Sequence, residues 1–247
     1  MDKGYLFVRN FFTNKQASMI KRSADRWQSV PTVKGKWMKY HEYSSDKKKL
    51  SRIENFYYHD AELQYLNSEF INPYLNELTN SNMVLFKDKL NFKFPNGKGF
   101  KPHQDQHAWS DFPPDLFVSV ALFPDSHTLE NGCLQFPEEW DGSKRIVLSE
   151  THLPENCDVD WKKITTTSKD ILFFNSYVPH FSKENNTDSS RRTIFLTFNN
   201  YSFGKLYNQY FVKKREVFPP DNELDPNKTY DMDSKYNLAN PFLLRRV

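Results

Sequence analysis

From about residue 84 the chain becomes a series of short apolar runs, and this pattern constrains the fold more than any other feature. The runs are bounded by Pro, Asp, Asn or Gly, and several alternate apolar with polar residues, as half-buried strands do. They are NMVLFKDKLNFKF, DLFVSVALF, GCLQF, RIVLS, DILFFNS and RRTIFLTFNNY. Aromatic residues make up 16% of the sequence while Gly contributes only 7 residues, which favours a sheet over a helical bundle.

Helical patterns precede these runs. The segment TNKQASMIKRSADRW has apolar residues at helical spacing, and Thr13 with Gln16 forms a capping box at its start. A second amphipathic helix, AELQYLNSEFINPYLNELT, is interrupted near Pro73. The opening GYLFVRNFF predicts a short strand, and the Lys-rich residues 31–50 predict a surface excursion.

Helices first and many short strands later indicate a mainly β fold with supporting helices. We expect a double-stranded β-helix core of the jelly-roll or cupin-like type. The length suits a single domain over residues 1–247. Within it we expect a helical N-terminal part (1–83), a jelly-roll core (about 84–205) and a loop-like C-terminal tail (206–247).

Composition limits the partners. The net charge of +3 is small and mixed along the chain, which argues against a nucleic-acid partner. No segment approaches the length of a membrane span, and the first 12 residues lack a long apolar stretch with a cleavage site. Two cysteines, Cys133 and Cys157, imply no disulfide framework. We therefore expect a cytoplasmic protein with a small-molecule partner, and the sequence leaves its oligomeric state open.

Three residues have the spacing of a metal site. His103 and Asp105 are one residue apart, so on an extended segment both side chains point to the same side. His180 follows the run DILFFNS at a Pro-containing turn and can supply a third ligand from a distant strand. Two imidazoles and one carboxylate suit Fe(II), with coordination positions left open. Two alternatives stay open: a chance H-x-D, and a compact zinc-type site of His103, Asp105 and His107.

A pair of arginines follows the distal histidine. Arg191 and Arg192 lie in SSRRTIFLTF, where alternation sends one guanidinium into the core and the other away from it. A guanidinium binds a carboxylate in bidentate fashion. A metal cluster with a nearby arginine therefore suggests an iron oxygenase that also binds an organic acid.

Five segments in order resemble the phytanoyl-CoA dioxygenase family of Fe(II)/2-oxoglutarate oxygenases. They are GYLFVRNFFT, SRIENF, FKFPNGKGFKPHQDQHAW, ENGCLQF and DILFFNSYVPHFSKENNTDSSRRTIFLTF. The resemblance implies a dioxygenase that uses Fe(II), 2-oxoglutarate and O2. It makes His103, Asp105 and His180 the iron ligands, and it selects Arg191 over Arg192 for the co-substrate.

The same resemblance implies further co-substrate contacts at Ser182, Gln104 and Arg52. The chain also departs from the family's pattern. FPEEWDG replaces the usual P-G-S-H, Phe181 stands in place of a glycine, and a tryptophan near residues 119–121 is absent. These departures affect the pocket and leave the iron site intact, and Asp105 argues against the halogenase branch.

The expected reaction is hydroxylation of an unactivated C–H bond, with release of succinate and CO2. Gln106, His107 and Trp109 follow the H-x-D motif, and we expect them to line the mouth of the site. Lys93, Lys101 and Arg192 would give the entrance a positive field and favour a small anionic metabolite.

Other functions stay open at this point. The tail KTYDMDSKYNLANPF is similar to family members that hydroxylate organophosphonates. A natural-product tailoring oxygenase, catalysing desaturation or cyclisation, would use the same iron centre. A non-catalytic jelly-roll binding module is the third alternative, because fold alone does not fix function.

Overall fold

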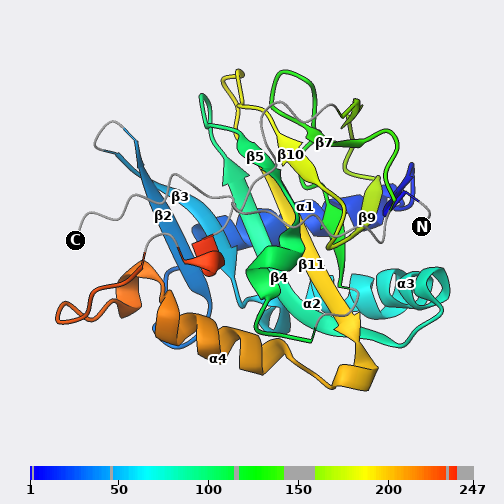
Figure 1. Cartoon of the computed structure of the whole chain (residues 1–247). Helices are drawn as coiled ribbons and strands as arrows, with labels where there is room; N and C mark the ends of the chain where they lie inside the picture. The colour runs from blue at the N-terminus through cyan, green and yellow to red at the C-terminus, as the bar shows by residue number, and fades with distance from the viewer. Residues whose placement is uncertain (2, 45–46, 114–116, 142–158, 232–233, 238–247) are drawn as a thin grey trace.

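Two antiparallel sheets form the core of the protein (Figure 1). The computed structural model describes residues 1, 3–44, 47–113, 117–141, 159–231 and 234–237. The major sheet has seven strands in the order β1-β9-β6-β11-β4-β3-β2, and the minor sheet has four in the order β5-β10-β7-β8. This arrangement confirms the expected mainly β fold with a jelly-roll core.

The predicted apolar runs coincide with strands of both sheets. The major sheet contains β1 (Tyr5–Val8), β2 (Met38–Ser44), β3 (Lys47–Glu54), β4 (Met83–Lys93), β6 (Val118–Leu122), β9 (Ile171–Asn175) and β11 (Arg191–Asn200). The minor sheet contains β5 (Phe100–His103), β7 (Leu134–Pro137), β8 (Trp161–Ile164) and β10 (His180–Ser182). The run RIVLS, at residues 145–149, lies outside the described residues.

The two faces of the major sheet bury different side chains. On β11, Ile194, Leu196 and Phe198 belong to the larger hydrophobic cluster, which packs against the helices. The other face meets the minor sheet, where a smaller cluster includes Phe136 and Phe174. Because side chains alternate along each strand, Lys87, Lys89 and Asn91 of β4 and Arg191 and Thr197 of β11 face the space between the sheets.

Helices cover the outer face and one edge of the major sheet (Figure 1). They are α1 (Asn14–Ser29), α2 (Ala61–Leu66), α3 (Asn72–Thr79) and α4 (Tyr207–Val217). The capping box predicted for α1 is present, since Thr13 and Gln16 exchange side-chain and backbone hydrogen bonds. The second predicted helix is interrupted by a π-helical segment at Asn67–Ile71, and Pro73 lies in the first turn of α3, where proline is tolerated.

Two regional predictions were wrong. Residues 31–50 are not a surface excursion, because most of them belong to β2 and β3 of the major sheet, and the N-terminal part (1–83) therefore holds three strands as well as helices. Lysines dominate this region, yet Met38 and Tyr40 are fully buried. The tail (206–247) is not wholly loop-like, because α4 occupies its start and buries Tyr210 and Phe211.

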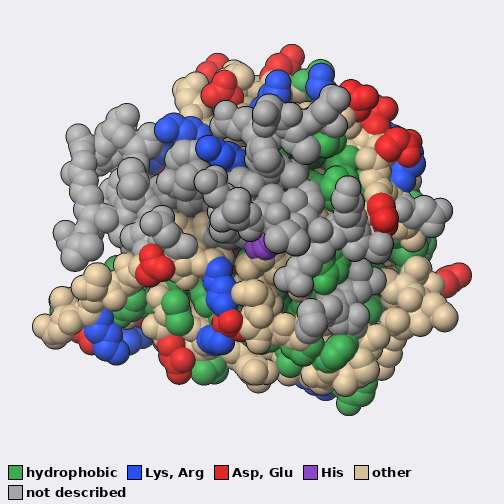
Figure 2. All heavy atoms as spheres, in the orientation of Figure 1, with side chains coloured by type: hydrophobic (Ala, Val, Ile, Leu, Met, Phe, Trp, Pro, Cys, Tyr) green, Lys and Arg blue, Asp and Glu red, His purple; other side chains and the backbone are tan. Residues whose placement is uncertain are grey.

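The described residues contain no helix with the length and apolar character needed to cross a bilayer. The face shown in Figure 2 mixes acidic and basic side chains, in agreement with the small net charge of +3. A histidine is visible near the centre of this face, with Lys or Arg side chains beside it (Figure 2).

A buried ion pair ties α4 to the major sheet. Lys214 of α4 donates to Glu54 of β3, and both side chains are almost completely inaccessible. Arg52 lies 3.0 Å from the other carboxylate oxygen of Glu54. Although burial favours the protonated acid, the charges of Lys214 and Arg52 hold the pKa of Glu54 at about 2.

We predict that Lys214→Met lowers the free energy of unfolding by about 3–5 kcal/mol, because it removes one partner of a buried charge pair. Its neighbour Lys213 is 43% exposed and pairs with Asp111, so Lys213→Met should cost about 1 kcal/mol or less. Urea denaturation of both variants provides the comparison. The contribution of Glu54 is present above its unfolded pKa of 4.5 and is lost as pH falls towards 2. Equal effects of the two variants would contradict this account.

Candidate metal and co-substrate site

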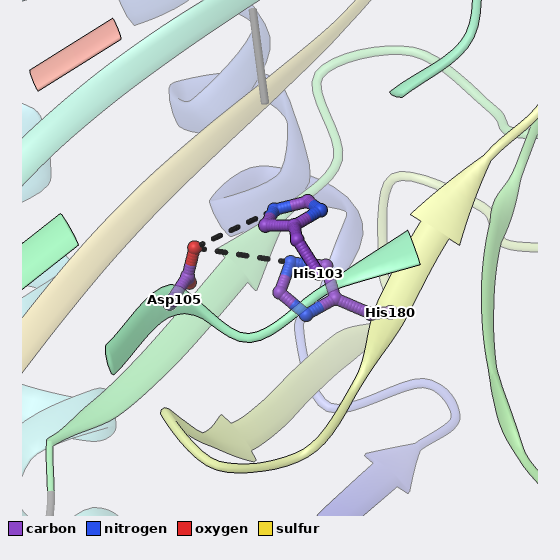
Figure 3. Close-up of side chains that lie close together, drawn as sticks. All are labelled: His103, Asp105 and His180. Atoms are coloured by element: carbon purple, nitrogen blue, oxygen red, sulfur yellow. Dashed lines mark ion pairs between the residues drawn. The ribbon is translucent and has the colours of Figure 1, made fainter. Parts of the chain in front are cut away.

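The pairing of two minor-sheet strands brings the two predicted histidines together. His180 on β10 is the register partner of His103 on β5, and their ring centroids lie 4.4 Å apart. Asp105 begins the 3₁₀ helix Asp105–Trp109, two residues after His103. Its Oδ1 atom lies 3.7 Å from Nε2 of His103 and 4.0 Å from Nε2 of His180 (Figure 3).

Backbone contacts orient both imidazoles. Nδ1 of His103 lies 2.7 Å from the carbonyl oxygen of Lys101, and Nδ1 of His180 lies 3.2 Å from that of Val178. A carbonyl only accepts, so Nδ1 carries the proton on each ring and Nε2 presents a lone pair. Burial lowers the pKa of both histidines, that of His103 to about 3. Both rings are therefore neutral, as metal ligation requires.

The spacing of the three side chains suits ligation of a shared metal ion better than direct hydrogen bonds among them. The separations of Asp105 from the two histidines are too long for hydrogen bonds. Two bonds of about 2.1 Å, the length that imidazole and carboxylate make to zinc, span at most about 4.2 Å. One atom from each residue lies within 4.8 Å of the others, and no second cluster of this kind occurs in the described part of the chain. His107 is not part of it, which removes the compact zinc-type alternative. Two nitrogens and one oxygen are the donor set of non-haem Fe(II) sites.

Arg191 lies in the same cavity as this cluster and is 4% exposed. Its Nη1 donates to the Thr193 hydroxyl at 2.9 Å, and its Nη2 donates to the Gly132 carbonyl at 2.5 Å. Burial lowers the pKa of Arg191 to about 10, so the guanidinium remains charged near neutral pH. Among the described residues no carboxylate forms an ion pair with it. A buried and unpaired cation is costly, and a ligand carboxylate would compensate for that cost.

The carbonyl that accepts from Arg191 depends on a glycine. Gly132 has φ +71°, a conformation that L side chains rarely adopt. A Cβ atom there would lie 2.2 Å from the carbonyl oxygen of Lys183 and 2.6 Å from that of Glu184. Only glycine lets the two backbones approach so closely, which explains the Gly in ENGCLQF.

Ser182 also lines this cavity, close to a buried lysine. Lys93 donates to the Ser182 hydroxyl at 2.8 Å and to the Lys183 carbonyl. Burial, assisted by the charge of Arg191, lowers the pKa of Lys93 to about 6. Lys93 is 4% exposed and burial disfavours its charge, so it does not provide the predicted positive field at the entrance. Its contact with Ser182 gives it a positioning role instead.

Further residues complete the lining of this first cavity. Arg52 is part of it, as the sequence predicted, but its guanidinium is already paired with Glu54. Lys89 and Asn91, on the inner face of β4, also line it and were missed. The alternating lysines of MVLFKDKLNFK, at 87, 89 and 93, were the available signal.

Several predicted contacts lie elsewhere. Gln104 donates to the Tyr177 carbonyl and is fully buried, and Gln106 accepts from the Ser176 hydroxyl at 2.6 Å. Neither residue, nor His107, lines the described cavities around the cluster. Gln104 has an extended backbone, so its side chain points to the side opposite those of His103 and Asp105. Gln106 and His107 lie in the 3₁₀ helix that follows, where this alternation no longer holds. Trp109 does line a second, adjoining cavity.

Arg192 faces the opposite side of β11 from Arg191, as alternation predicts. It forms ion pairs with Asp125 at 2.8 Å and Asp25 at 2.7 Å. These contacts connect β11 to α1. Arg192 therefore serves the fold and does not contribute to an entrance field, contrary to the sequence-based expectation.

Comparisons with a family model, with relatives in sequence and with solved structures agree on one protein family. The family model described as phytanoyl-CoA dioxygenase (PhyH) matches residues 1–193. A 2-aminoethylphosphonate dioxygenase from the uncultured bacterium HF130_AEPn_1 is 38% identical over 254 residues, covering 97% of this chain and 94% of the relative. A methylphosphonate hydroxylase from Gimesia maris is 31% identical, covering 87% and 84%. In structure, EctD from S. alaskensis, solved with 2-oxoglutarate and 5-hydroxyectoine, matches with a TM-score of 0.71 at 18% identity, covering 82% of this chain and 74% of that one.

We predict that Asp105→Ala lowers the affinity for Fe(II) by at least tenfold, because it removes the only carboxylate of the cluster. His107→Ala is the matched control and should leave metal affinity within about twofold. Anaerobic equilibrium dialysis against Fe(II), with iron measured by atomic absorption, reports both values. Loss of binding in the His107 variant alone would restore the zinc-type alternative.

Proposed function

Since the chain belongs to the phytanoyl-CoA dioxygenase family and is an Fe(II)/2-oxoglutarate-dependent dioxygenase, we propose that its substrate is a small organophosphonate. The reaction is hydroxylation of an unactivated C–H bond: 2-oxoglutarate, O2 and the substrate give succinate, CO2 and the hydroxylated product. The observation that carries the site assignment is a metal-type cluster and an unpaired buried guanidinium in one cavity.

In this proposal His103, Asp105 and His180 hold the iron on one face. When bound, iron supplies the activation of O2, of which one oxygen atom enters succinate and the other enters the C–H bond. The Lys101 and Val178 carbonyls fix the proton on Nδ1 of each histidine, so that both Nε2 atoms stay available as ligands. His103, Asp105 and His180 line the first cavity, where the keto-acid end of 2-oxoglutarate would bind beside the iron.

Arg191 binds the distal carboxylate of 2-oxoglutarate. Thr193 and Gly132 occupy two of its donor groups and hold the guanidinium plane. Ser182 offers a hydroxyl to the same carboxylate, and Lys93 orients that hydroxyl. The negative charge of the co-substrate compensates the buried positive charge of Arg191. Binding of 2-oxoglutarate is therefore expected to stabilise the protein.

The substrate class is supported by two relatives and by charge. The 2-aminoethylphosphonate dioxygenase and the methylphosphonate hydroxylase both align over more than four-fifths of this chain. The cavities around the cluster are lined by Arg52, Lys87 and Lys89, while Asp105 is the only acidic residue among the described residues that line them. A cavity of this charge favours an anion over a neutral or cationic substrate.

We also propose a single domain and a cytosolic location. One continuous hydrophobic cluster joins residues from α1 to α4 and reaches Tyr236, which supports one domain over the described part of residues 1–247. Cys133 is a buried free thiol, which is typical of a reducing compartment, and Cys157 lies outside the described residues.

We predict that Arg191→Gln raises the Kd for 2-oxoglutarate by about 30-fold or more, equivalent to about 2 kcal/mol, because a desolvated charge pair is lost. Arg192→Gln is the matched control from the adjacent position and should change that Kd less than about threefold. Anaerobic titration calorimetry with Fe(II)-loaded protein measures both. An unchanged Kd in the Arg191 variant would rule out its role as the carboxylate clamp.

The substrate is tested by succinate release. With methylphosphonate or 2-aminoethylphosphonate present, the wild-type enzyme should form succinate well above its substrate-free rate, and the product mass should rise by one oxygen atom. Asp105→Ala should form neither product. Desaturation or cyclisation would instead remove two hydrogens. Substrate-free succinate formation that no phosphonate stimulates would refute the substrate class while leaving the enzyme class intact.

A further inference from the structure

A second cavity adjoins the first one on the inner face of the major sheet. The two share Arg52, Lys89, Asp105, His180 and Phe195, but Arg191 and Ser182 line only the first. The second continues along β4 and β11 to Lys87 and Thr197. Thr197 lies six positions after Arg191 on β11, which is roughly 20 Å of extended strand. One small ligand cannot occupy both ends.

Register places three of the lining side chains in one row. Lys87 of β4 is the partner of Thr197 on β11, and Thr197 is the partner of Ser119 on β6. Lys89 lies two residues further along β4 on the same face, opposite Phe195. Two ammonium groups and two hydroxyls are thus fixed on three neighbouring strands.

Arg52 and Lys235 of this cavity are paired with Glu54 and Asp111, whereas its other two cations, Lys87 and Lys89, have few partners. Lys89 makes no hydrogen bond and no ion pair among the described residues, and its ammonium lies 5.1 Å from the Phe195 ring. Burial and the charge of Lys87 lower the pKa of Lys89 to about 8. Within the described part of the chain, Lys87 donates only to the Tyr210 hydroxyl, at 3.1 Å. The buried carboxylate of Glu54, whose charge acts on both lysines, is already paired with Lys214 and Arg52.

Other donors in the cavity are also unsatisfied. Nε1 of Trp109 and the hydroxyl of Tyr236 are buried and have no hydrogen-bond partner among the described residues. The hydroxyls of Ser119 and Thr197 lie 2.9 Å apart, so one donates to the other and the second proton is left over. Buried polar groups are rarely left unpaired, so a surplus of donors indicates a ligand rich in acceptors.

We infer that Lys87 and Lys89, with the hydroxyls of Ser119 and Thr197, form a subsite for the oxyanion head group of the substrate. A compact tetrahedral head group of charge near −2, such as a phosphonate, matches two point charges and several donors on different strands. This inference rests on the proposed function, since it places the substrate beside Asp105 and His180 and away from the 2-oxoglutarate clamp. The subsite makes Lys87 and Lys89 specificity-determining residues.

The test measures binding before turnover. Enzyme loaded with Fe(II) and 2-oxoglutarate is titrated anaerobically with methylphosphonate and, separately, with inorganic phosphate. Lys89→Met should weaken both by about 10- to 100-fold, because a charged hydrogen bond is lost. Lys87→Met, whose side chain lines only the second cavity, should weaken both in the same way and change the Kd for 2-oxoglutarate less than about threefold. Lys213→Met removes the same charge from the surface and serves as the control.

Two milder variants guard against a folding defect. Lys89→Arg keeps the charge and should retain binding within about tenfold, while Thr197→Val removes one hydroxyl and should weaken binding several-fold. Unchanged phosphate and methylphosphonate binding in Lys89→Met would overturn the subsite. So would equal losses of phosphate and 2-oxoglutarate affinity in Lys87→Met, since the two ends of the cavity would then not be separate.

The outcomes also separate this subsite from the proposed substrate. Phosphate binding that depends on Lys89, without turnover of any phosphonate, supports the anion subsite and refutes the substrate class. Turnover of methylphosphonate that does not depend on Lys89 supports the substrate class and overturns the subsite.

Discussion

The antiparallel pairing of β5 with β10 is the constraint on which the site depends. It sets His180 opposite His103, and the turn after β5 then brings Asp105 to the same point. A slip of one residue would turn one imidazole to the other face of the sheet and abolish the cluster. Close backbone packing protects the register, because a Cβ atom on Gly99 would lie 2.3 Å from the Ser182 carbonyl oxygen.

The space between the sheets carries more positive charge than the chain neutralises. Arg191, Lys89 and Lys87 are buried or half-buried without carboxylate partners among the described residues, whereas Glu54 balances Arg52 and Lys214. Such an arrangement reduces stability in the absence of ligands. Two anionic ligands, one at each end of β4 and β11, would restore the balance. The free-energy cost of burying these unpaired cations therefore favours the binding of anionic ligands.

The sequence predicted the parts of the fold whose signals are local. Thr13 and Gln16 identified the start of α1, and alternation in RRTIFLTF separated Arg191 from Arg192 correctly. It failed where tertiary burial overrides composition. Two strands were missed in residues 31–50 because lysines outnumber the buried apolar residues there, such as Met38 and Tyr40.

Site residues were predicted where their order along the chain is informative. The H-x-D spacing identified His103 and Asp105, but it also suggested mouth positions for Gln106 and His107. The 3₁₀ helix that begins at Asp105 ends the alternation on which that prediction relied. Lys87 and Lys89 were missed because a lysine on a strand usually faces solvent, and only the second sheet makes that face interior.

The two sheets contribute different residues to the site, and this has a consequence for substrate specificity. The cluster comes from β5, β10 and the turn after β5, whereas the cationic rows come from β4 and β11 of the opposing sheet. In the proposed subsite, substitutions at Lys87 or Thr197 would therefore alter substrate binding without moving His103, Asp105 or His180. The far wall of the second cavity includes Tyr210 of α4 and Tyr236, both from the C-terminal part of the chain. Changes in that part can reshape the substrate end of the cavity while Arg191, at the other end of β11, keeps its contacts with Gly132 and Thr193.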